Sequence, residues 1–195
     1  MYSQNNEEEV IVGYFGTDFK GQLIDIGAYN PFKFSNTRKL YELGWGCSFV
    51  EPSKICFESF VQEYAGAKNV KLFNFAMGDH NGTVDFYDST GDALSTTSVD
   101  HLEKWKTYNA NFQKVTVEMR EINEFLAEHD SIDFLSIDVE STNMQLFNVI
   151  KDEHLARTTM LCIEHDGADK EICNRLAKFG HKTLLYNAEN LILAK

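Results

Sequence analysis

Gln22-Leu-Ile-Asp-Ile-Gly-Ala-Tyr-Asn-Pro31 joins an apolar segment to a loop that contains an acid and a glycine. A second apolar segment ends in a similar way, at Ser48-Phe-Val-Glu-Pro52. Ligands of α/β proteins bind at the carboxyl ends of parallel strands, where such loops begin. We therefore expect a nucleoside-binding site at the ends of these two strands.

The composition of the chain predicts a single domain, residues 1–195, with one sizeable core. A length of 195 residues and a hydrophobic content of 43% fall within the range of one domain. The formal net charge of −12 has the wrong sign for gripping a phosphate backbone, and no local basic patch offsets it. We therefore expect no nucleic-acid partner.

The sequence contains no pattern of a membrane span or a metal knuckle. No window reaches ~18 uninterrupted apolar residues, and residues 1–9 are polar and acidic, unlike a signal peptide. We expect a cytoplasmic protein without a membrane partner. The four cysteines lie far apart in sequence and are expected to be buried reduced thiols: Cys47, Cys56, Cys162 and Cys173.

Apolar runs alternate with helical patterns along most of the chain, which is typical of a parallel sheet covered by helices on both faces. The predicted strands are 23–26, 48–50, 70–75, 115–119, 132–137 and 159–164, and the predicted helices are 7–15, 35 or 36 to 43, 53–64, 122–128, 143–150 and 170–179. In the third of these helices, Ile55, Phe57, Phe60, Val61 and Tyr64 form the expected apolar stripe. Segments 183–186 and 191–194 predict a terminal hairpin, so at least one strand runs antiparallel.

The middle of the chain departs from this alternation. Residues 83–87 predict an extra strand, and the small polar residues 89–98 predict a mobile loop. Val99, Leu102, Trp105 and Tyr108 then recur at helical spacing, which predicts a short helix able to close over a pocket. The two aromatic residues of this helix suit stacking on a sugar ring, although such a stripe more often belongs to the core.

Asp25 and Glu51 are the first candidate ligand-binding residues. Glu51 follows Asp25 by 26 positions and has the chemistry to accept both hydroxyls of a ribose from a partly exposed position. The alternatives are a helix-capping aspartate and a solvated glutamate. The phosphate-binding pattern G-x-G-x-x-G is absent, since Asn30-Pro31 occupies its place. The ligand expected from these residues is a nucleoside without a diphosphate.

Several motifs together resemble the FkbM-type family of S-adenosylmethionine-dependent methyltransferases. They are Asp25-Ile-Gly-Ala-Tyr-Asn-Pro-Phe-Lys-Phe-Ser-Asn-Thr37, Leu40-Tyr41, Gly44-Trp45, Glu51-Pro52, Ala76-Met-Gly-Asp79 and Ile132-Asp-Phe-Leu-Ser-Ile-Asp-Val-Glu140, with Tyr2-Ser-Gln4 and Glu7-Glu-Glu9 at the front. The resemblance covers most of the chain. It implies a Rossmann-like, seven-stranded, mostly parallel α/β sheet whose last strand is antiparallel.

The resemblance also implies a cofactor site and a reaction. It places Asp25, Gly27 and Ala28 on the methionine side of S-adenosylmethionine, Glu51 at the ribose and Met77, Gly78 and Asp79 near the adenine, with Asn30, Ser35, Asn36 and Pro52 as further cofactor-binding residues. Such proteins typically methylate a hydroxyl oxygen of a sugar or polyketide-like small molecule. The usual Asp-Val-Glu-Gly-x-Glu is here Asp138-Val-Glu-Ser-Thr-Asn143, so either the acceptor differs or the site is partly degenerate.

Methyl transfer needs a positioned oxygen and a group that removes its proton. Asp138, Glu140 and His165 are the candidate catalytic residues, because the ends of their strands converge if the sheet has the family's strand order. Crowded carboxylates are relieved by raised pKa values or by a cation, so Asp138, Glu164 and Asp166 are a candidate Mg²⁺ site. The alternatives are a surface position for His165 and a helix-start position for Glu140.

Three functional hypotheses remain open at this point. The first is an O-methyltransferase of small molecules or glycans. The second keeps the fold but methylates nitrogen or a macromolecule. The third is a degenerate module that binds the cofactor without turnover. The sequence leaves the oligomeric state open, with a homodimer as one alternative.

Overall fold

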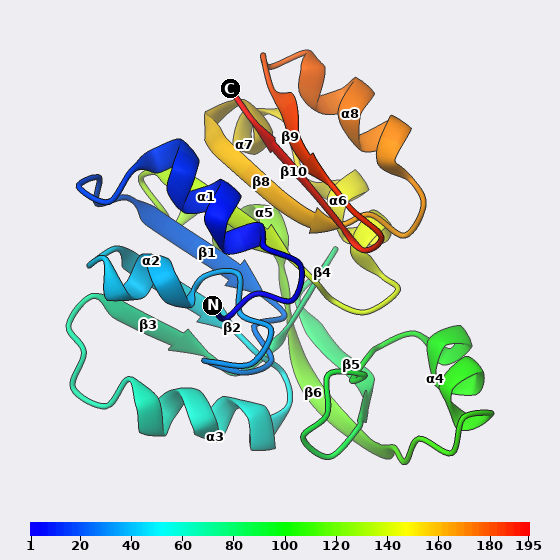
Figure 1. Ribbon diagram of the computed structural model, residues 1–195. Coiled ribbons are helices and arrows are strands. Elements are labelled where there is room, and N and C mark those ends of the chain that lie inside the picture. Colours follow the sequence, from blue (N-terminus) through cyan, green and yellow to red (C-terminus); the bar gives the residue numbers. More distant parts are fainter.

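The main sheet has seven strands in the order β3-β2-β1-β7-β8-β10-β9 (Figure 1). In this computed structural model, which describes residues 1–195, the strands are β1 Gln22–Ile26, β2 Gly46–Val50, β3 Val70–Phe73, β7 Ile132–Ile137, β8 Thr158–Glu164, β9 Lys182–Tyr186 and β10 Asn190–Ala194. The first five in spatial order pair in parallel, whereas β10 runs antiparallel to both β8 and β9. The predicted sheet and its antiparallel terminal hairpin are confirmed.

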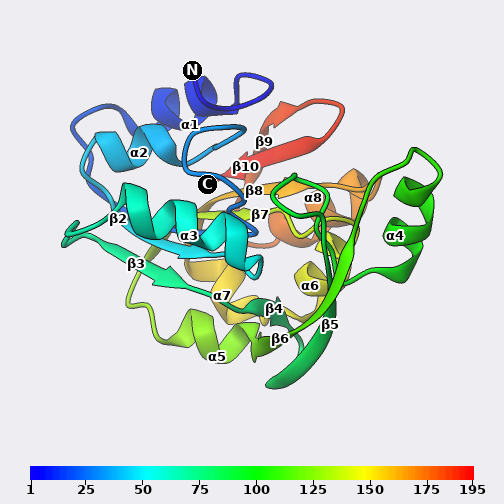
Figure 2. The ribbon, with the colours of Figure 1, turned by 90° about the horizontal axis from the view of Figure 1, so that it is seen from below.

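Helices cover both faces of this sheet (Figure 2). Helices α1 Glu7–Phe15, α2 Arg38–Glu42 and α3 Lys54–Glu63 pack on one face, and α5 Ile122–Ala127, α6 Asn143–Val149, α7 Asp152–Arg157 and α8 Asp169–Ala177 pack on the other. Successive strand residues point to opposite faces, so Leu23 joins the core under α1 to α3 and Ile24 joins the core under α5 to α8. None of the helices combines the length and the apolar content needed to cross a membrane.

A second, three-stranded sheet projects from the main one, with helix α4 Val99–Lys106 beside it (Figure 1). Its strands are β4 Ala76–Gly78, β5 Gly82–Asp88 and β6 Gln113–Glu121, in the order β4-β6-β5. Residues 89–98 form no helix or strand, as predicted, but they are tied to β5 by two backbone hydrogen bonds between Tyr87 and Thr96, of 2.8 and 3.2 Å. This arrangement places the 89–98 segment and α4 opposite the carboxyl ends of the main strands.

Local signals explain several boundaries. Gly44 ends α2 at φ +91°, with its N–H bonded to Tyr41 O at 2.8 Å and the Trp45 N–H bonded to Leu40 O at 3.2 Å. This is the glycine-terminated pattern expected at that position. Ser53 caps α3 by accepting a hydrogen bond from the Cys56 N–H.

The helical residues of α2 begin at Arg38, and Ser35, at the predicted start, caps the helix because its Oγ accepts the Arg38 N–H at 3.0 Å. Other expectations were wrong. The third strand stops at Phe73, and α7 was not predicted from its short pattern. Ile55 and Val61 are 53% and 47% exposed, so they lie outside the apolar stripe of α3.

The four thiols are free, as predicted. Cys47, Cys56 and Cys162 are buried, whereas Cys173 is half-buried.

Candidate functional site

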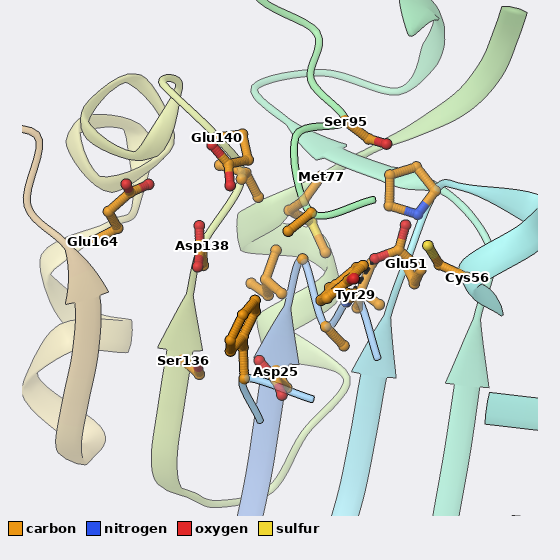
Figure 3. Close-up of a pocket in the computed structure, with 18 of the residues that line it drawn as sticks. Asp25, Tyr29, Glu51, Cys56, Met77, Ser95, Ser136, Asp138, Glu140 and Glu164 are labelled. Carbon is orange, nitrogen blue, oxygen red and sulfur yellow. Dashed lines mark hydrogen bonds between the residues drawn. The ribbon is translucent and has the colours of Figure 1, made fainter. Parts of the chain in front are cut away.

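A cavity of about 460 Å³ lies at the carboxyl ends of β1, β2 and β7. Its wall is completed by β4, by residues 92–97 with Trp105 of α4, and by the β9–β10 turn. Figure 3 shows two groups of carboxyl side chains in it: Glu51 lies on one side, and Asp138, Glu140 and Glu164 lie on the other, with Asp25 between the strands. No lysine, arginine or histidine lines the cavity.

Asp25 and Glu51 are both buried at the strand ends where the sequence predicted them. Thr37 Oγ1 donates a hydrogen bond of 2.7 Å to Asp25 Oδ2, and burial raises the Asp25 pKa to about 6. Glu51 Oε2 accepts the Tyr29 N–H at 2.8 Å and Oε1 accepts the Ser53 N–H at 2.7 Å. Burial raises the Glu51 pKa to about 7, so the backbone donors offset only part of the cost of burying its charge.

The expectation that Glu51 is partly exposed was wrong. Its exposed fraction is 5%, because the β1–α2 loop folds over it and supplies one of its two backbone donors. Each oxygen still has a lone pair free after accepting one backbone N–H. The carboxyl therefore stabilises two loops and faces the cavity at the same time.

Most of the other predicted cofactor residues line the cavity. These are Gly27, Ala28, Ser35, Asn36, Pro52 and Met77. Asn30 does not, since its Oδ1 accepts the Phe32 and Lys33 N–H groups, both at 2.9 Å, and closes its own loop. Gly78 and Asp79 lie outside it as well, because the chain leaves the cavity after Met77 and Asp79 is exposed, with its carboxyl 2.6 Å from His80 Nδ1.

Gly27 has a structural reason to be glycine. Its φ is +81°, and a Cβ at this position would lie 1.7 Å from the backbone oxygen of Asp138. The β1 and β7 ends are joined at the same place by the Asp138 N–H bond to Ile26 O, 2.9 Å long. Gly27 thus lets the loop after β7 pass close to the loop after β1, which sets Asp25 and Asp138 on one cavity wall.

The carboxyl side chains on the other side of the cavity, those of Asp138, Glu140 and Glu164, have raised pKa values. Burial, followed by the charges of Glu164 and Asp166, raises the pKa of Glu140 to about 8. Burial, followed by Glu164 and Glu140, also raises the pKa of Asp138. The pKa of Glu164 is raised by its burial and by Asp166. A positive charge entering this part of the cavity would relieve the repulsion.

Asn143 donates hydrogen bonds to two neighbouring acids, Glu164 and Asp166. It is fully buried, its Nδ2 donates to Glu164 Oε2 at 2.7 Å and to Asp166 Oδ2 at 3.1 Å, and its Oδ1 accepts the Val139 N–H at 2.7 Å. A third carboxylate at this position would have no proton to donate. Asn143 therefore links the loop after β7, through Val139, to Glu164 and Asp166.

The structure places His165, a predicted catalytic residue, in hydrogen bonds to the backbone, and its catalytic role stays a prediction. Its Nδ1 accepts the Gly167 N–H at 3.0 Å, which places the ring proton on Nε2, 3.1 Å from Asn187 O. The ring is buried and does not line the cavity. Both nitrogens are therefore used to hold the turn after β8.

The predicted Mg²⁺ site also lacks support. No three side chains among the histidines, cysteines and acids are arranged to hold a metal ion. Asp166, one of the three proposed ligands, turns to Asn143 and does not line the cavity, although Asp138 and Glu164 do.

Sequence reasoning missed several lining residues from distant segments. Ser136 faces Asp25 from the neighbouring strand, and Tyr29, Phe34 and Ser95 come from loops. Gln4 reaches the cavity because its Nε2 bonds Glu189 Oε1 at 3.1 Å across 185 positions. Of these, only Tyr29 and Phe34 were indicated by the sequence, because they belong to the loop that follows Asp25.

The two aromatic residues of the α4 pattern have different environments. Trp105 lines the cavity, whereas Tyr108 is 71% exposed. Neither belongs to the buried core.

Comparison with known proteins identifies a family and a solved structure of similar fold. The model of the methyltransferase FkbM domain matches residues 25–183. The crystal structure of methyltransferase FkbM from Methylobacillus flagellatus KT is similar in fold, with a TM-score of 0.59 at 10% identity over 91% of this chain and 44% of that one. This chain thus spans less than half the length of that relative, and at this identity the likeness concerns the fold alone. No curated protein gave a significant match.

Proposed function

Because this chain belongs to the methyltransferase FkbM domain family, we propose that it transfers a methyl group from S-adenosylmethionine to a hydroxyl oxygen of a small molecule or glycan. The observation that carries the proposal is the cavity at the ends of β1, β2 and β7, with Glu51 at one end, Asp138 and Glu140 at the other, and Asp25 between them. One end suits a nucleoside and the other suits proton removal.

The residues of the cavity fit the chemistry of S-adenosylmethionine. Glu51 keeps a free lone pair on each oxygen, which suits the adjacent hydroxyls of a ribose. The cofactor carries a sulfonium and an ammonium group, and a cavity lined by acids without any basic side chain suits both charges. A dinucleotide is a poorer fit, because no basic residue or glycine-rich turn is present to hold its pyrophosphate.

When bound, S-adenosylmethionine supplies an electrophilic methyl group. The chain then has to hold the acceptor oxygen and take its proton. Asp138 and Glu140 line the cavity and are the candidates for this step. The pKa of Glu140, about 8, lies near neutral pH, where a general base works best.

The charge of the cavity also bears on the acceptor. Acceptors with phosphate or carboxylate groups would meet only acids in the lining and no basic side chain. A neutral polyhydroxylated molecule meets no such repulsion. Trp105 offers an aromatic face at the cavity wall, which suits a sugar ring.

Calorimetry provides the first test. S-adenosylmethionine and its demethylated product should bind at micromolar strength, and NAD should not bind. Tight NAD binding without binding of either sulfur compound would overturn the cofactor assignment.

Activity is tested with a panel of matched acceptors, namely a neutral sugar, its amino analogue and its phosphate ester, with product masses measured. Methylation on an oxygen of the neutral sugar supports the proposal. Methylation on the nitrogen of the amino analogue would instead indicate an N-methyltransferase. Asp138→Asn should retain cofactor binding and lower the turnover rate by about 10²-fold. Binding of the cofactor without turnover on any acceptor would instead indicate a degenerate module.

A further inference from the structure

The turn that carries Glu140 is unusual in its backbone. Glu140 and the next residue, Ser141, both adopt left-handed conformations, with φ +50° and +66°. L-residues rarely take this conformation because Cβ crowds the backbone, and two in succession need outside contacts to hold them.

Two of those contacts come from residues 89–98 and helix α4, beside the small sheet. Thr96 Oγ1 donates a hydrogen bond of 2.6 Å to the backbone oxygen of Glu140. His101 on α4 has its Nδ1 2.8 Å from Ser141 Oγ. The 89–98 segment and helix α4 therefore both bond directly to the turn.

His101 is placed to act on both residues of the turn. It is 4% exposed, and its burial lowers its pKa, which favours the neutral ring. When Ser141 donates to Nδ1, the single ring proton is on Nε2. Nε2 lies 3.7 Å from Glu140 Oε2, which is beyond hydrogen-bond distance, and has no hydrogen-bond partner.

We propose that His101 is a positioning residue. It holds the Glu140–Ser141 turn against α4, so that the carboxyl of Glu140 keeps a fixed position relative to the cavity wall formed by residues 92–97 and Trp105. The inference rests on the proposed function for the role of Glu140 in proton removal. The contact itself does not depend on that function.

Ser141 makes this contact possible in this chain. The resemblance described above places glycine at this position, and glycine adopts φ +66° without strain but has no hydroxyl to reach His101. The serine introduces strain into the turn and links it to α4. The departure from the family pattern is therefore explained by a contact instead of by loss of a site.

The test uses hydrogen exchange in the intact chain, loaded with the demethylated cofactor product or free. His101→Leu and Ser141→Ala should each raise the exchange rate of the Val139 and Leu146 amides, which belong to the turn and its helix, by about three- to tenfold. The double variant should exchange no faster than the single ones, because both remove the same bond.

Rescue and a matched control separate positioning from general loosening. His101→Asn restores an acceptor near the place of Nδ1 and should return the exchange most of the way to wild type. Thr107→Val removes the hydroxyl bond to Lys104 O, 2.6 Å long, at the C-terminal end of α4 and leaves the contacts of His101 intact, so it should loosen that end of the helix without changing the Val139 amide.

Trp105 supplies a second readout. Its ring lies 6.0 Å from that of His101, so its fluorescence should shift to the red in His101→Leu and return in His101→Asn, with Trp105→Phe identifying the signal.

The outcomes are decisive. Unchanged exchange at Val139 and Leu146 in both His101→Leu and Ser141→Ala, or equal effects in Thr107→Val, would overturn the proposal. Loss of cofactor binding in the wild type would overturn the proposed function instead and leave the exchange result standing. With an accepted substrate in hand, His101→Leu should lower kcat while leaving the KM for the cofactor unchanged.

Discussion

The cavity acids should make the ligand-free protein less stable as the pH rises above neutral. A carboxyl whose pKa is higher in the folded chain than in the unfolded chain holds its proton more tightly when folded. Its stabilising effect is complete below the unfolded pKa and is lost as pH rises through the folded pKa. Asp25, Glu51 and Glu140, with folded pKa values of about 6, 7 and 8, are such groups.

The size of the effect follows from the protons held. At pH 7 these three carboxyls hold roughly 0.1, 0.5 and 0.9 of a proton in the folded chain and almost none in the unfolded chain. By pH 8 the total falls to about 0.6, so the average excess between pH 7 and 8 is about one proton. These three groups should therefore lower the free energy of unfolding by about 1.4 kcal/mol over that interval, and Asp138 and Glu164, whose pKa values are also raised, add to the fall.

Four histidines act in the opposite direction. Their pKa values are lowered by burial, so they titrate at lower pH and change little above pH 7: His101, His129, His154 and His181. Burial raises the pKa of the Cys47, Cys56 and Cys162 thiols, so these add to the fall in stability near pH 8 and above, and the interval from pH 7 to 8 reports mainly on the acids.

Urea unfolding at pH 7.0, 7.5, 8.0 and 8.5, at constant ionic strength, measures the slope. Glu51→Gln should flatten it, because one of the titrating groups is gone. A free energy of unfolding that is level or rises over this interval would refute the reasoning about the buried carboxyls.

Three further substitutions test the geometry of the site. Glu51→Gln offers one acceptor oxygen to two backbone donors, so it should lower the free energy of unfolding by about 1–3 kcal/mol in urea titrations and weaken cofactor-product binding at least tenfold by calorimetry. Gly27→Ala should cost about 3 kcal/mol or more because its Cβ meets backbone, whereas Gly180→Ala, also at positive φ but with open space around its Cβ, should cost only about 1–2 kcal/mol. Asn143→Asp puts a carboxylate at a buried position and removes the donors to Glu164 and Asp166, so it should cost about 3–5 kcal/mol at pH 8 and less at pH 5; equal losses at the two pH values would contradict the role given to the amide.

The sequence predicted the main sheet because its strands are strongly apolar and its loops carry clear glycine signals. Ile132–Ile137 was predicted to the residue, and the helix at Glu7–Phe15 likewise. The short strand Ala76–Gly78 was not predicted, because three residues carry no period and it pairs only with β6, about forty positions later. Ile55 and Val61 were misplaced because a mostly apolar helix does not reveal which side faces solvent.

The acids of the site were predicted from their position at the ends of strands, whereas Ser35 and Asn36 were predicted from the family resemblance. Asp25, Glu51, Asp138 and Glu140 were found from their strand ends, and all four line the cavity. His165 also follows a strand, but its ring is turned away by contacts with a later turn, which one strand end cannot reveal.

The front of the chain completes the cavity only once the end of the chain is in place. Gln4 and Asn5 donate side-chain hydrogen bonds to the two oxygens of Glu189, of 3.1 and 3.0 Å, and Glu7 Oε1 accepts from Asn190 at 2.9 Å. Contacts across more than 180 positions close late in folding, because the entropy of closing such a loop has to be overcome first. During synthesis on the ribosome the strands that carry Asp25 and Glu51 emerge long before the β9–β10 turn. A nascent chain therefore has Asp25 and Glu51 in place before it has the wall that encloses the cavity, and the proposed cofactor should bind only after synthesis is complete.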